Sequence, residues 1–597
     1  MTRTTGPGLF QPHTLALAIA LGISAPAQAI NFNIGEIEGQ FDSSLSIGAS
    51  WSMRSPDRDL IGPNNGGQGQ AQTGDDGRLN FKKGETFSKI FKGIHDLELK
   101  YGDTGAFVRG KYWYDFELKD ESRLFKDISD HNRKEGAKSS GAEILDAFLY
   151  HNYAIGDLPG TVRVGKQVVS WGESTFIGNS INAINPIDVA AFRRPGAEIK
   201  EGLIPVNMLY LSQSLTDRLS MEAFYQLEWD QTILDNCGTF FSTADVAADG
   251  CDSGYHIGSP AIAPLQPIAA AFGQGFRVDS EGVILPRAGD RDARDSGQWG
   301  LALRWLGDET EYGAYFINYH SRTPIVSTQN AGLATLAALP GIIGTANGIA
   351  PGSGAGLAQS VMLGNGRYYL EYPEDIRLYG LSFSTTLPTG TAWAGEVSYR
   401  PNLPLQINTT DMTLSLLNPI APGTAPVAAG PGQDNVGYRR KEVTQVQTTF
   451  THFFDQVMGA GRFTLVGEIG MAHVGGLESR EDLRYGRDSL FGAYGFRGDT
   501  HGFVTSTSWG YRVRGIWEYS NVFAGVNLRP NVSWSHDVDG YGPNGLFNEG
   551  AKAVSFGVDA DYRNTYTASL SYTDFFGGKY NTAVDRDFLA LSFGVSF

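Results

Sequence analysis

The chain has 597 residues, and its 64 acidic and 47 basic side chains give a formal net charge of −17. Such acidity excludes a nucleic-acid partner, because neutralising phosphates requires a basic surface. Only 19% of the residues are charged, whereas 12% are aromatic and 76 are glycine, which is unlike an average soluble protein. Beyond the N-terminus no stretch of about 18 apolar residues occurs, which argues against membrane-spanning helices. The classes of protein that remain are a soluble multidomain protein and a membrane β-barrel.

The first 29 residues have the pattern of a secretory signal peptide. Arg3 gives a positive start, residues 14–23 form a short apolar core, and Ala27 and Ala29 are the small residues expected before a cleavage site. The apolar core is too short to span a bilayer, which argues against a membrane anchor. We expect cleavage after Ala29 and export of the mature chain, residues 30–597, as a single domain.

The chain contains two cysteines, Cys237 and Cys251, which lie in a polar segment. In an oxidising compartment such a pair favours a disulfide. No other cysteine or histidine flanks them at the spacing of a metal site. We therefore expect a disulfide and no metal ion.

The C-terminal segment alternates strictly between two kinds of residue. A period of two predicts a strand with one apolar face and one small or polar face. An alternating last strand that ends in phenylalanine resembles the assembly signal of bacterial outer-membrane barrels. The apolar face consists of Leu589, Leu591, Phe593, Val595 and Phe597, of which Phe593, Val595 and Phe597 are the expected signal.

The same alternation recurs along the chain, with tyrosine and tryptophan near the ends of the runs. Because lipid leaves every backbone group to be paired within the protein, such strands must close into a barrel. We expect an all-β transmembrane antiparallel β-barrel with short periplasmic turns and long extracellular loops. We expect about eighteen strands. Because strand boundaries predicted from one sequence are accurate only to a few residues, a count of about sixteen is also compatible with the pattern. The predicted strands are 41–53, 93–102, 105–118, 144–155, 161–169, 204–214, 218–230, 297–306, 311–322, 374–386, 391–401, 440–454, 461–474, 506–519, 521–534, 551–562, 565–576 and 586–597.

Charged side chains lie on the faces opposite to the apolar ones. If the apolar faces point to lipid, these charges line the lumen, where water can hydrate them. Both signs are present, so the set identifies no substrate. The predicted lumen charges are Arg109, Lys111, Asp115, Glu222, Glu228, Glu396, Arg400, Glu468, Arg512, Arg514, Glu518 and Arg529.

Residues 170–203 leave the alternation between the fifth and sixth predicted strands. The segment is rich in side chains that form local hydrogen bonds. We expect it to fold into the lumen as a constriction or plug, and a structured surface loop is the alternative. The candidate constriction residues are Trp171, Glu173, Asn179, Asn182, Arg193 and Arg194.

Three predicted outer loops, residues 253–276, 323–366 and 412–433, contain no Asp, Glu, Lys or Arg. Loops in water are normally polar, and exposed apolar surface often marks a binding site. Such loops could collect a hydrophobic solute and pass it to the barrel. The alternative is that they pack on one another, on the barrel mouth or on lipid headgroups.

Four stretches, WGESTFIGNSINAINPIDV, RRPGAEIKEGLIPV, NCGTFFSTADVAADGCD and GEVSYRPNLPLQIN, resemble the domain of unknown function 1302 family of Gram-negative outer-membrane proteins, found in Pseudomonas and related bacteria. The resemblance extends over nearly the whole mature chain. It implies a place in the outer membrane, among outer-membrane lipid and lipopolysaccharide, after insertion by the barrel-assembly machinery. It also implies an RND-type transporter and a periplasmic lipoprotein-like carrier as partners, and traffic in lipids or hydrophobic compounds. It supplies no functional residues.

No zinc-protease, phosphate-binding or dinucleotide-binding motif is present in the sequence. We therefore expect no enzymatic activity and no cofactor. The working hypothesis is an outer-membrane channel for hydrophobic small molecules or lipids. One alternative is a general porin for polar solutes. Another is a non-transporting partner that docks a periplasmic lipid carrier or an exporter.

Overall fold

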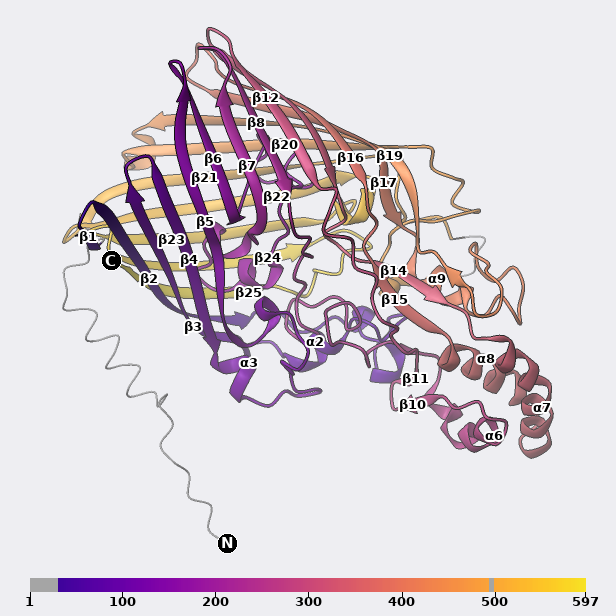
Figure 1. Ribbon diagram of the computed structural model, residues 1–597. Coiled ribbons are helices and arrows are strands. Elements are labelled where there is room, and N and C mark those ends of the chain that lie inside the picture. The colour runs from indigo at the N-terminus through magenta and orange to yellow at the C-terminus, as the bar shows by residue number, and fades with distance from the viewer. Residues whose placement is uncertain (1–29, 493–498) are drawn as a thin grey trace.

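The computed structural model describes residues 30–492 and 499–597, so the predicted signal peptide, with Ala27 and Ala29, lies outside the described residues. Eighteen antiparallel strands form a closed barrel, which confirms the predicted fold (Figure 1). Each predicted strand overlaps one of them. The barrel strands are β2 (Ile37–Ser52), β3 (Thr86–Tyr101), β4 (Thr104–Asp115), β5 (Ser140–Ile155), β6 (Leu158–Gln167), β7 (Val206–Ser214), β8 (Leu219–Gln226), β12 (Trp299–Leu306), β13 (Thr310–Tyr319), β16 (Ile376–Thr386), β17 (Ala392–Gln406), β19 (Tyr438–Asp455), β20 (Arg462–Gly475), β21 (Thr507–Phe523), β22 (Val526–Asp539), β23 (Lys552–Tyr562), β24 (Tyr566–Phe576) and β25 (Phe588–Ser596).

The barrel closes where β25 pairs with β2, and the backbones of Ser43 and Phe597 exchange two hydrogen bonds at the end of this seam. A further strand, β1 (Ile30–Ile34), pairs with the same strand two residues farther along, beginning with Ile30 opposite Phe41. β1 and β25 are both antiparallel to β2. They therefore lie end to end along one edge of β2.

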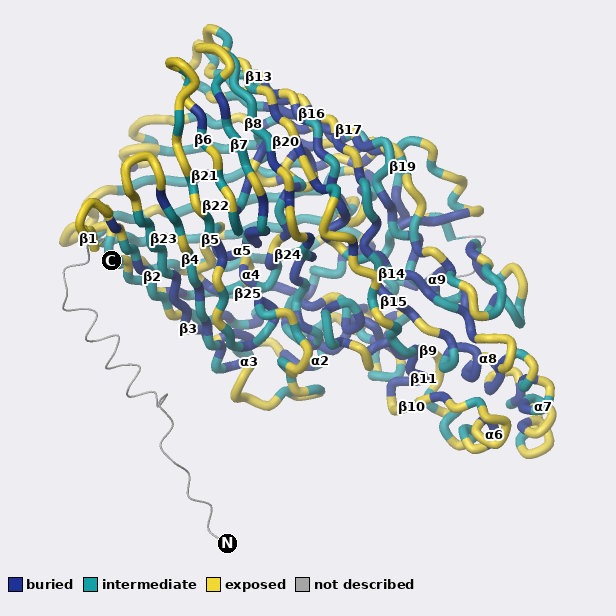
Figure 2. The backbone as a smooth tube through the Cα atoms, in the orientation of Figure 1, coloured by how far each residue is buried: buried dark blue, intermediate teal, exposed yellow. Residues whose placement is uncertain are grey.

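The two ends of the barrel differ. At one end, which we name the turn end, hairpins are tight, and Gly102 and Gly156 adopt positive φ values that glycine tolerates best. Both described ends of the chain lie there (Figure 1). At the opposite end, the loop end, long connections fold over the mouth. Buried residues run through the barrel interior and these connections, whereas the tight turns are exposed (Figure 2).

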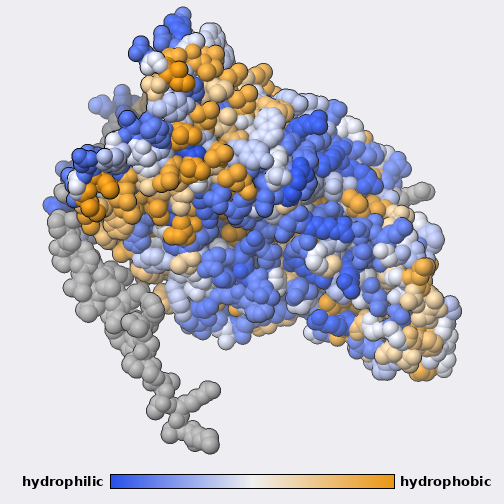
Figure 3. Space-filling view, viewed as in Figure 1, coloured by the Kyte–Doolittle hydropathy of each residue, from blue (hydrophilic) through white to orange (hydrophobic). Residues whose placement is uncertain are grey.

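The outer face of the strands is apolar. Large apolar side chains such as Leu149, Leu381, Ile469 and Phe593 are exposed on it. Hydrophobic side chains gather over the strands in the space-filling view, whereas much of the loop end is hydrophilic (Figure 3). This distribution matches a barrel whose outer surface faces lipid.

The loops carry the remaining regular structure. No helix among residues 30–492 and 499–597 has the length and apolar character needed to cross a bilayer. The helices are α2 (Asp76–Asn80), α3 (Phe116–Asp120), α4 (Val189–Arg193), α5 (Ile199–Gly202), α6 (Gln266–Ala271), α7 (Leu333–Ile349), α8 (Gly354–Asn365) and α9 (Thr409–Ser415). Short strands pair as β9 (His256–Ile257), β10 (Arg277–Asp279) and β11 (Gly282–Ile284), and as β14 (Ile325–Gln329), β15 (Arg367–Glu371) and β18 (Asp434–Asn435).

The three charge-free segments pack on one another, and we name them together the apolar cap. Their shared core includes Ile268 of α6, Leu339 and Ile342 of α7, and Val361 of α8. The cap stands out from the loop end (Figure 1), and an apolar patch covers its tip (Figure 3). Leu333 and Ile349, the first and last residues of α7, are 72% and 67% exposed, whereas Leu339 and Ile342 between them are buried. Mutual packing therefore accounts for part of the apolar surface of these loops but not for the two ends of α7.

The predicted disulfide is present between Cys237 and Cys251 in the β8–β12 loop. Their Cα atoms are 6.3 Å apart, and 14 positions separate them in the sequence. The bridge closes a short loop beside the barrel mouth.

Candidate functional site

The connection from β6 to β7, residues 168–205, crosses the barrel interior, and we name it the inward segment. Its residues form hydrogen bonds with β3 and β4 and also with β17 and β20. These two groups of strands are far apart around the ring. A connection can contact both only by passing through the lumen.

Two lumen carboxylates fix the middle of the inward segment through its backbone. Glu468 of β20 accepts hydrogen bonds from the amides of Thr175 (3.0 Å), Phe176 (2.6 Å) and Ile177 (2.8 Å). Glu396 of β17 accepts one from the amide of Glu173 at 2.5 Å. Carboxylates that accept several amide hydrogen bonds form strong, charge-assisted contacts. Backbone donors that would otherwise lie unpaired in the lumen are thereby satisfied.

Long polar side chains from the same wall bind the carbonyl groups of the inward segment. Gln445 of β19 donates to the carbonyl of Gly178 at 2.9 Å, and Gln447 donates to that of Ile177 at 3.0 Å. Arg400 of β17 donates to the carbonyl of Ser180 at 2.5 Å. Donors and acceptors of the segment are thus both paired with the barrel wall.

Trp171 anchors the start of the inward segment on a second part of the wall. Its indole Nε1 donates to Glu222 Oε2 of β8 at 2.7 Å, and its ring lies 5.1 Å from that of Phe224 and 5.9 Å from that of Tyr315, between centroids. Arg304 forms an ion pair with the same carboxylate at 3.1 Å. The buried aromatic cluster fixes the direction in which the segment leaves β6.

Two buried lysines hold the other half of the segment. Lys92 Nζ of β3 lies 2.5 Å from Glu201 Oε1, and Lys111 Nζ of β4 lies 3.2 Å from Asp188 Oδ2. All four side chains are buried. Removing Glu201 would leave Lys92 buried without a carboxylate partner, whereas Lys111 also lies 3.5 Å from Glu143. The two pairs help to specify where α4 and α5 dock.

Glycines on the lumen wall make room for the inward segment. A Cβ atom at Gly380 would lie 2.8 Å from Ile181, one at Gly470 would lie 2.7 Å from Ile177, and one at Gly48 would lie 2.8 Å from Pro195. Such distances are well below ordinary van der Waals contact. The barrel wall is therefore shaped to hold this segment.

The predicted constriction residues have different places in the structure. Trp171 is buried on the wall, and the backbone of Glu173 is bound by Glu396. Asn179 adopts a positive φ of 63°, and Asn182 donates to Ser170 at 2.9 Å within the segment.

The two predicted arginines of the segment point to the loop end instead. Arg193 forms an ion pair with Asp235 at 2.8 Å, and Arg194 donates to the carbonyl of Gly136 at 2.7 Å. Their role in the structure is to tie the segment to neighbouring loops.

Most predicted lumen charges have partners. Arg109 pairs with Asp96 at 2.7 Å, and Arg512 pairs with Asp537 at 2.6 Å. Lys111, Glu222, Glu396, Arg400 and Glu468 bind or adjoin the inward segment, as described above. Asp115 caps α3, and Glu228 lies just beyond β8, where it accepts from Asn207.

The lumen face of β21, β22 and β23 differs from the rest of the wall in its polar contacts, and we name it the free wall. Glu468 lies directly opposite Arg512 in the β20–β21 register, and alternation places Arg514 on the same lumen face. Among the described residues, no hydrogen bond or ion pair joins the inward segment to β21, β22 or β23. This free wall is polar and includes Arg514, Glu518, Arg529, Asn531, Ser533 and Asp559.

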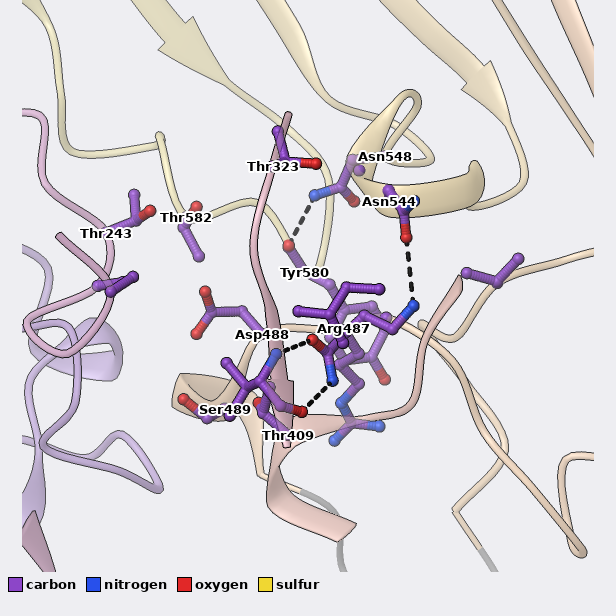
Figure 4. Close-up of a pocket in the computed structure, with 18 of the residues that line it drawn as sticks. Thr243, Thr323, Thr409, Arg487, Asp488, Ser489, Asn544, Asn548, Tyr580 and Thr582 are labelled. Carbon is purple, nitrogen blue, oxygen red and sulfur yellow. Dashed lines mark hydrogen bonds between the residues drawn. The ribbon is translucent and has the colours of Figure 1, made fainter. Parts of the chain in front are cut away.

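A cavity of about 530 Å³ opens among the loops at the loop end, and we name it the vestibule (Figure 4). Its lining is mixed, with Ile325, Val504 and Tyr580 beside threonines and Arg487. The Arg487 guanidinium binds Asp499 at 2.7 Å and lies 4.7 Å from the ring centre of Tyr580. Burial raises the pKa of Asp488, although its contact with the amide of Leu490 at 2.9 Å acts in the opposite direction.

The apolar cap adjoins the vestibule, and the vestibule adjoins the inward segment, through residues that neighbouring regions share. Val246 and Tyr255 belong to the core of the cap and also line the vestibule. Phe547 lines the vestibule and packs with Ile177 of the inward segment. Packed side chains therefore connect the core of the cap, the vestibule and the inward segment.

Several of these residues cannot be assigned from the sequence. Glu396 and Glu468 are predicted as lumen charges, but their partners are backbone amides more than two hundred positions away. Glycines at inward-facing positions of the strands were the available sequence signal that another part of the backbone approaches the wall closely. Arg487 and the vestibule lie in irregular loops that carry no periodic pattern.

Comparison with solved structures finds outer-membrane proteins of low sequence identity. A BenF-like porin from Pseudomonas fluorescens Pf-5 has 8% identity and a TM-score of 0.40, with 94% of this chain and 98% of that chain covered. OccAB3 from Acinetobacter baumannii has 9% identity and a TM-score of 0.39, with 93% and 99% covered. OpdK from Pseudomonas aeruginosa, solved with vanillate, has 8% identity and a TM-score of 0.38, with 93% and 98% covered.

No curated protein matches the sequence. A family model described as "Protein of unknown function (DUF1302)" matches residues 11–597. The match covers almost the whole chain and confirms the resemblance noted in the sequence. The chain belongs to the DUF1302 family.

Proposed function

We propose that the protein is an outer-membrane channel that takes up or releases small hydrophobic or amphiphilic molecules. The observation that carries the proposal is the continuity of the apolar cap, the vestibule and the inward segment. The cap offers an apolar surface for capture, and the mixed lining of the vestibule suits a molecule with an apolar body and a polar group. The free wall then offers a hydrated route through the lumen.

A general porin for polar solutes is the second candidate, and the polar free wall is the observation that favours it. A polar wall of this kind is the main requirement for a wide aqueous pore. The exposed apolar surface of the cap has no role in that function. We therefore place it second.

The partners of the channel remain part of the proposal. A periplasmic lipoprotein-like carrier and an RND-type transporter would receive or supply the cargo at the turn end. A non-transporting docking role would need the same partners without any passage through the lumen.

The cap can be tested without disturbing its core. Leu333 and Ile349 are 72% and 67% exposed at the two ends of α7, so Leu333→Ser and Ile349→Ser together remove exposed apolar surface and leave the core of the cap unchanged. We expect slower entry of an apolar fluorescent probe into proteoliposomes, with small-ion conductance in a planar bilayer unchanged. Met458→Ser is the matched control, because Met458 is an exposed apolar residue at the turn end.

The outcomes separate the candidates. Equal probe entry for the cap variant and the control would remove the cap from the transport route. Large, stable conductance steps with no entry of the apolar probe would favour the general porin. A folded barrel that passes neither ions nor probe would favour the docking role.

A further inference from the structure

Three buried aspartates meet where two loops cross at the loop end. Asp75 and Asp76 begin α2 in the β2–β3 loop, and Asp245 lies in the β8–β12 loop. Their side chains are 0%, 6% and 2% exposed, and one oxygen of each lies within 4.8 Å of the others. Three carboxylates brought out of water at this distance repel one another unless a cation or a proton joins them.

The hydrogen bonds of the cluster leave two buried oxygens unused. Asp75 Oδ2 accepts from the amide of Gly62 at 2.8 Å and from Asn65 at 3.0 Å, and Asp245 Oδ2 accepts from the amide of Asp76 at 3.2 Å. Asp75 Oδ1 and Asp245 Oδ1 are buried and accept no hydrogen bond from any described residue. A buried carboxylate oxygen without a partner is rare and costly. These two oxygens point to a missing ligand.

The neighbouring ammonium group of Lys126 does not supply that ligand. Lys126 Nζ lies 2.9 Å from Asp76 Oδ1 and 2.5 Å from Glu281 Oε2, so two carboxylates share it. It forms no hydrogen bond with Asp75 or Asp245 among the described residues.

We propose that Asp75, Asp76 and Asp245 bind a divalent cation of the calcium type. Carboxylate oxygens are the ligands that Ca²⁺ prefers, and Ca²⁺ tolerates an irregular set completed by water and carbonyl groups, whereas Mg²⁺ requires a near-ideal octahedron. A divalent cation would offset two of the three aspartate charges, and Lys126 lies beside Asp76 and Glu281. Lys126 reaches the solvent and can keep its contact with Glu281 when the cation takes Asp76.

The bound cation ties the β2–β3 loop to the β8–β12 loop beside the vestibule. Thr73, two residues before Asp75, and Thr243, two residues before Asp245, both line this cavity. The cation thus fixes the spacing of two vestibule walls. The site does not depend on what the channel carries, because it is formed by loop residues outside the transport route.

The test is a calcium titration of the full-length mature chain, purified in detergent without lipopolysaccharide and treated with EGTA. We expect isothermal titration with CaCl₂ to show one saturable site, and MgCl₂ to bind more weakly. Asp245→Asn keeps the side-chain shape and should weaken Ca²⁺ binding about tenfold or more, because affinity follows the number of ligand charges. Asp252→Asn removes one exposed charge from the same loop and should bind as the original chain does.

The proposal is overturned if the original chain shows no saturable heat, or if Asp245→Asn and Asp252→Asn bind Ca²⁺ equally well. In the first case the cluster holds a proton, and Asp245→Asn should then raise the thermal stability with no effect of Ca²⁺. Heat-modifiable gel mobility shows whether each variant is folded. If Asp245→Asn does not fold, Asp75→Asn provides the same comparison from the other loop. Transport assays do not enter this test, so failure of the channel proposal would leave it unchanged.

Discussion

At the scale of single residues, Glu468 is the side chain that holds the inward segment most directly. It accepts three backbone hydrogen bonds from Thr175, Phe176 and Ile177. A hydrogen bond to a charged group contributes roughly 1.5–3 kcal/mol, so Glu468→Ala should weaken the docking of the segment by at least that amount. We expect a larger and noisier single-channel conductance in planar bilayers.

The control for this prediction is Glu518→Ala. Glu518 is a carboxylate on the lumen face of β21 and forms no hydrogen bond with the inward segment among the described residues. If both variants change the current equally, the effect comes from lumen charge and not from release of the segment. Glu468→Gln keeps one acceptor oxygen and should give an intermediate conductance.

At the scale of elements, the disulfide stabilises one loop and not the barrel. The cysteines are 14 positions apart, and closing a loop of about 15 residues contributes about 3 kcal/mol in the chain-entropy model. Replacing both cysteines by serine should therefore increase amide hydrogen exchange across residues 230–298. Exchange in β8 and β12, which flank the loop, should stay slow. Unchanged exchange in the loop would show that its packing alone holds it.

The elements also show which parts of the structure a sequence can predict. Strand alternation is a local signal, and all eighteen barrel strands were predicted from it, whereas β1 was missed because it has only five residues. α7 and α8 have no period of 3.6 to detect, since their apolar residues face all sides and Pro340 lies inside α7. The docking of the inward segment depends on pairs such as Thr175 with Glu468, which are 293 positions apart. No local pattern encodes such a contact.

At the scale of the whole molecule, Phe597 completes the seam at which the barrel closes. Phe597 exchanges hydrogen bonds of 2.6 and 2.8 Å with the backbone of Ser43 at the β25–β2 seam. Deleting Phe597 removes both bonds and the terminal aromatic ring of the predicted assembly signal. We expect much less heat-modifiable, folded barrel in the outer membrane of a Gram-negative host.

The control is Phe523→Ala, which removes an exposed aromatic ring at the turn end of β21. It should leave the folded fraction unchanged. If deletion of Phe597 lowers the folded fraction no more than this control, the terminal residue has no special part in assembly. Purified, refolded protein should tolerate the deletion better than protein made in cells, because refolding does not require recognition by the assembly machinery.

The end-to-end placement of β1 and β25 has a topological consequence. Ile30 lies opposite Phe41, and Phe597 lies opposite Ser43, so a linker opposite Asp42 would join the two ends into one continuous strand. Residues 30 and 597 therefore lie next to each other on one edge of β2. A circular permutant that joins them and opens another tight turn would keep every strand pair of the barrel but would no longer end in the predicted assembly signal. Folding of such a permutant from purified protein would separate the architecture of the barrel from its recognition during assembly.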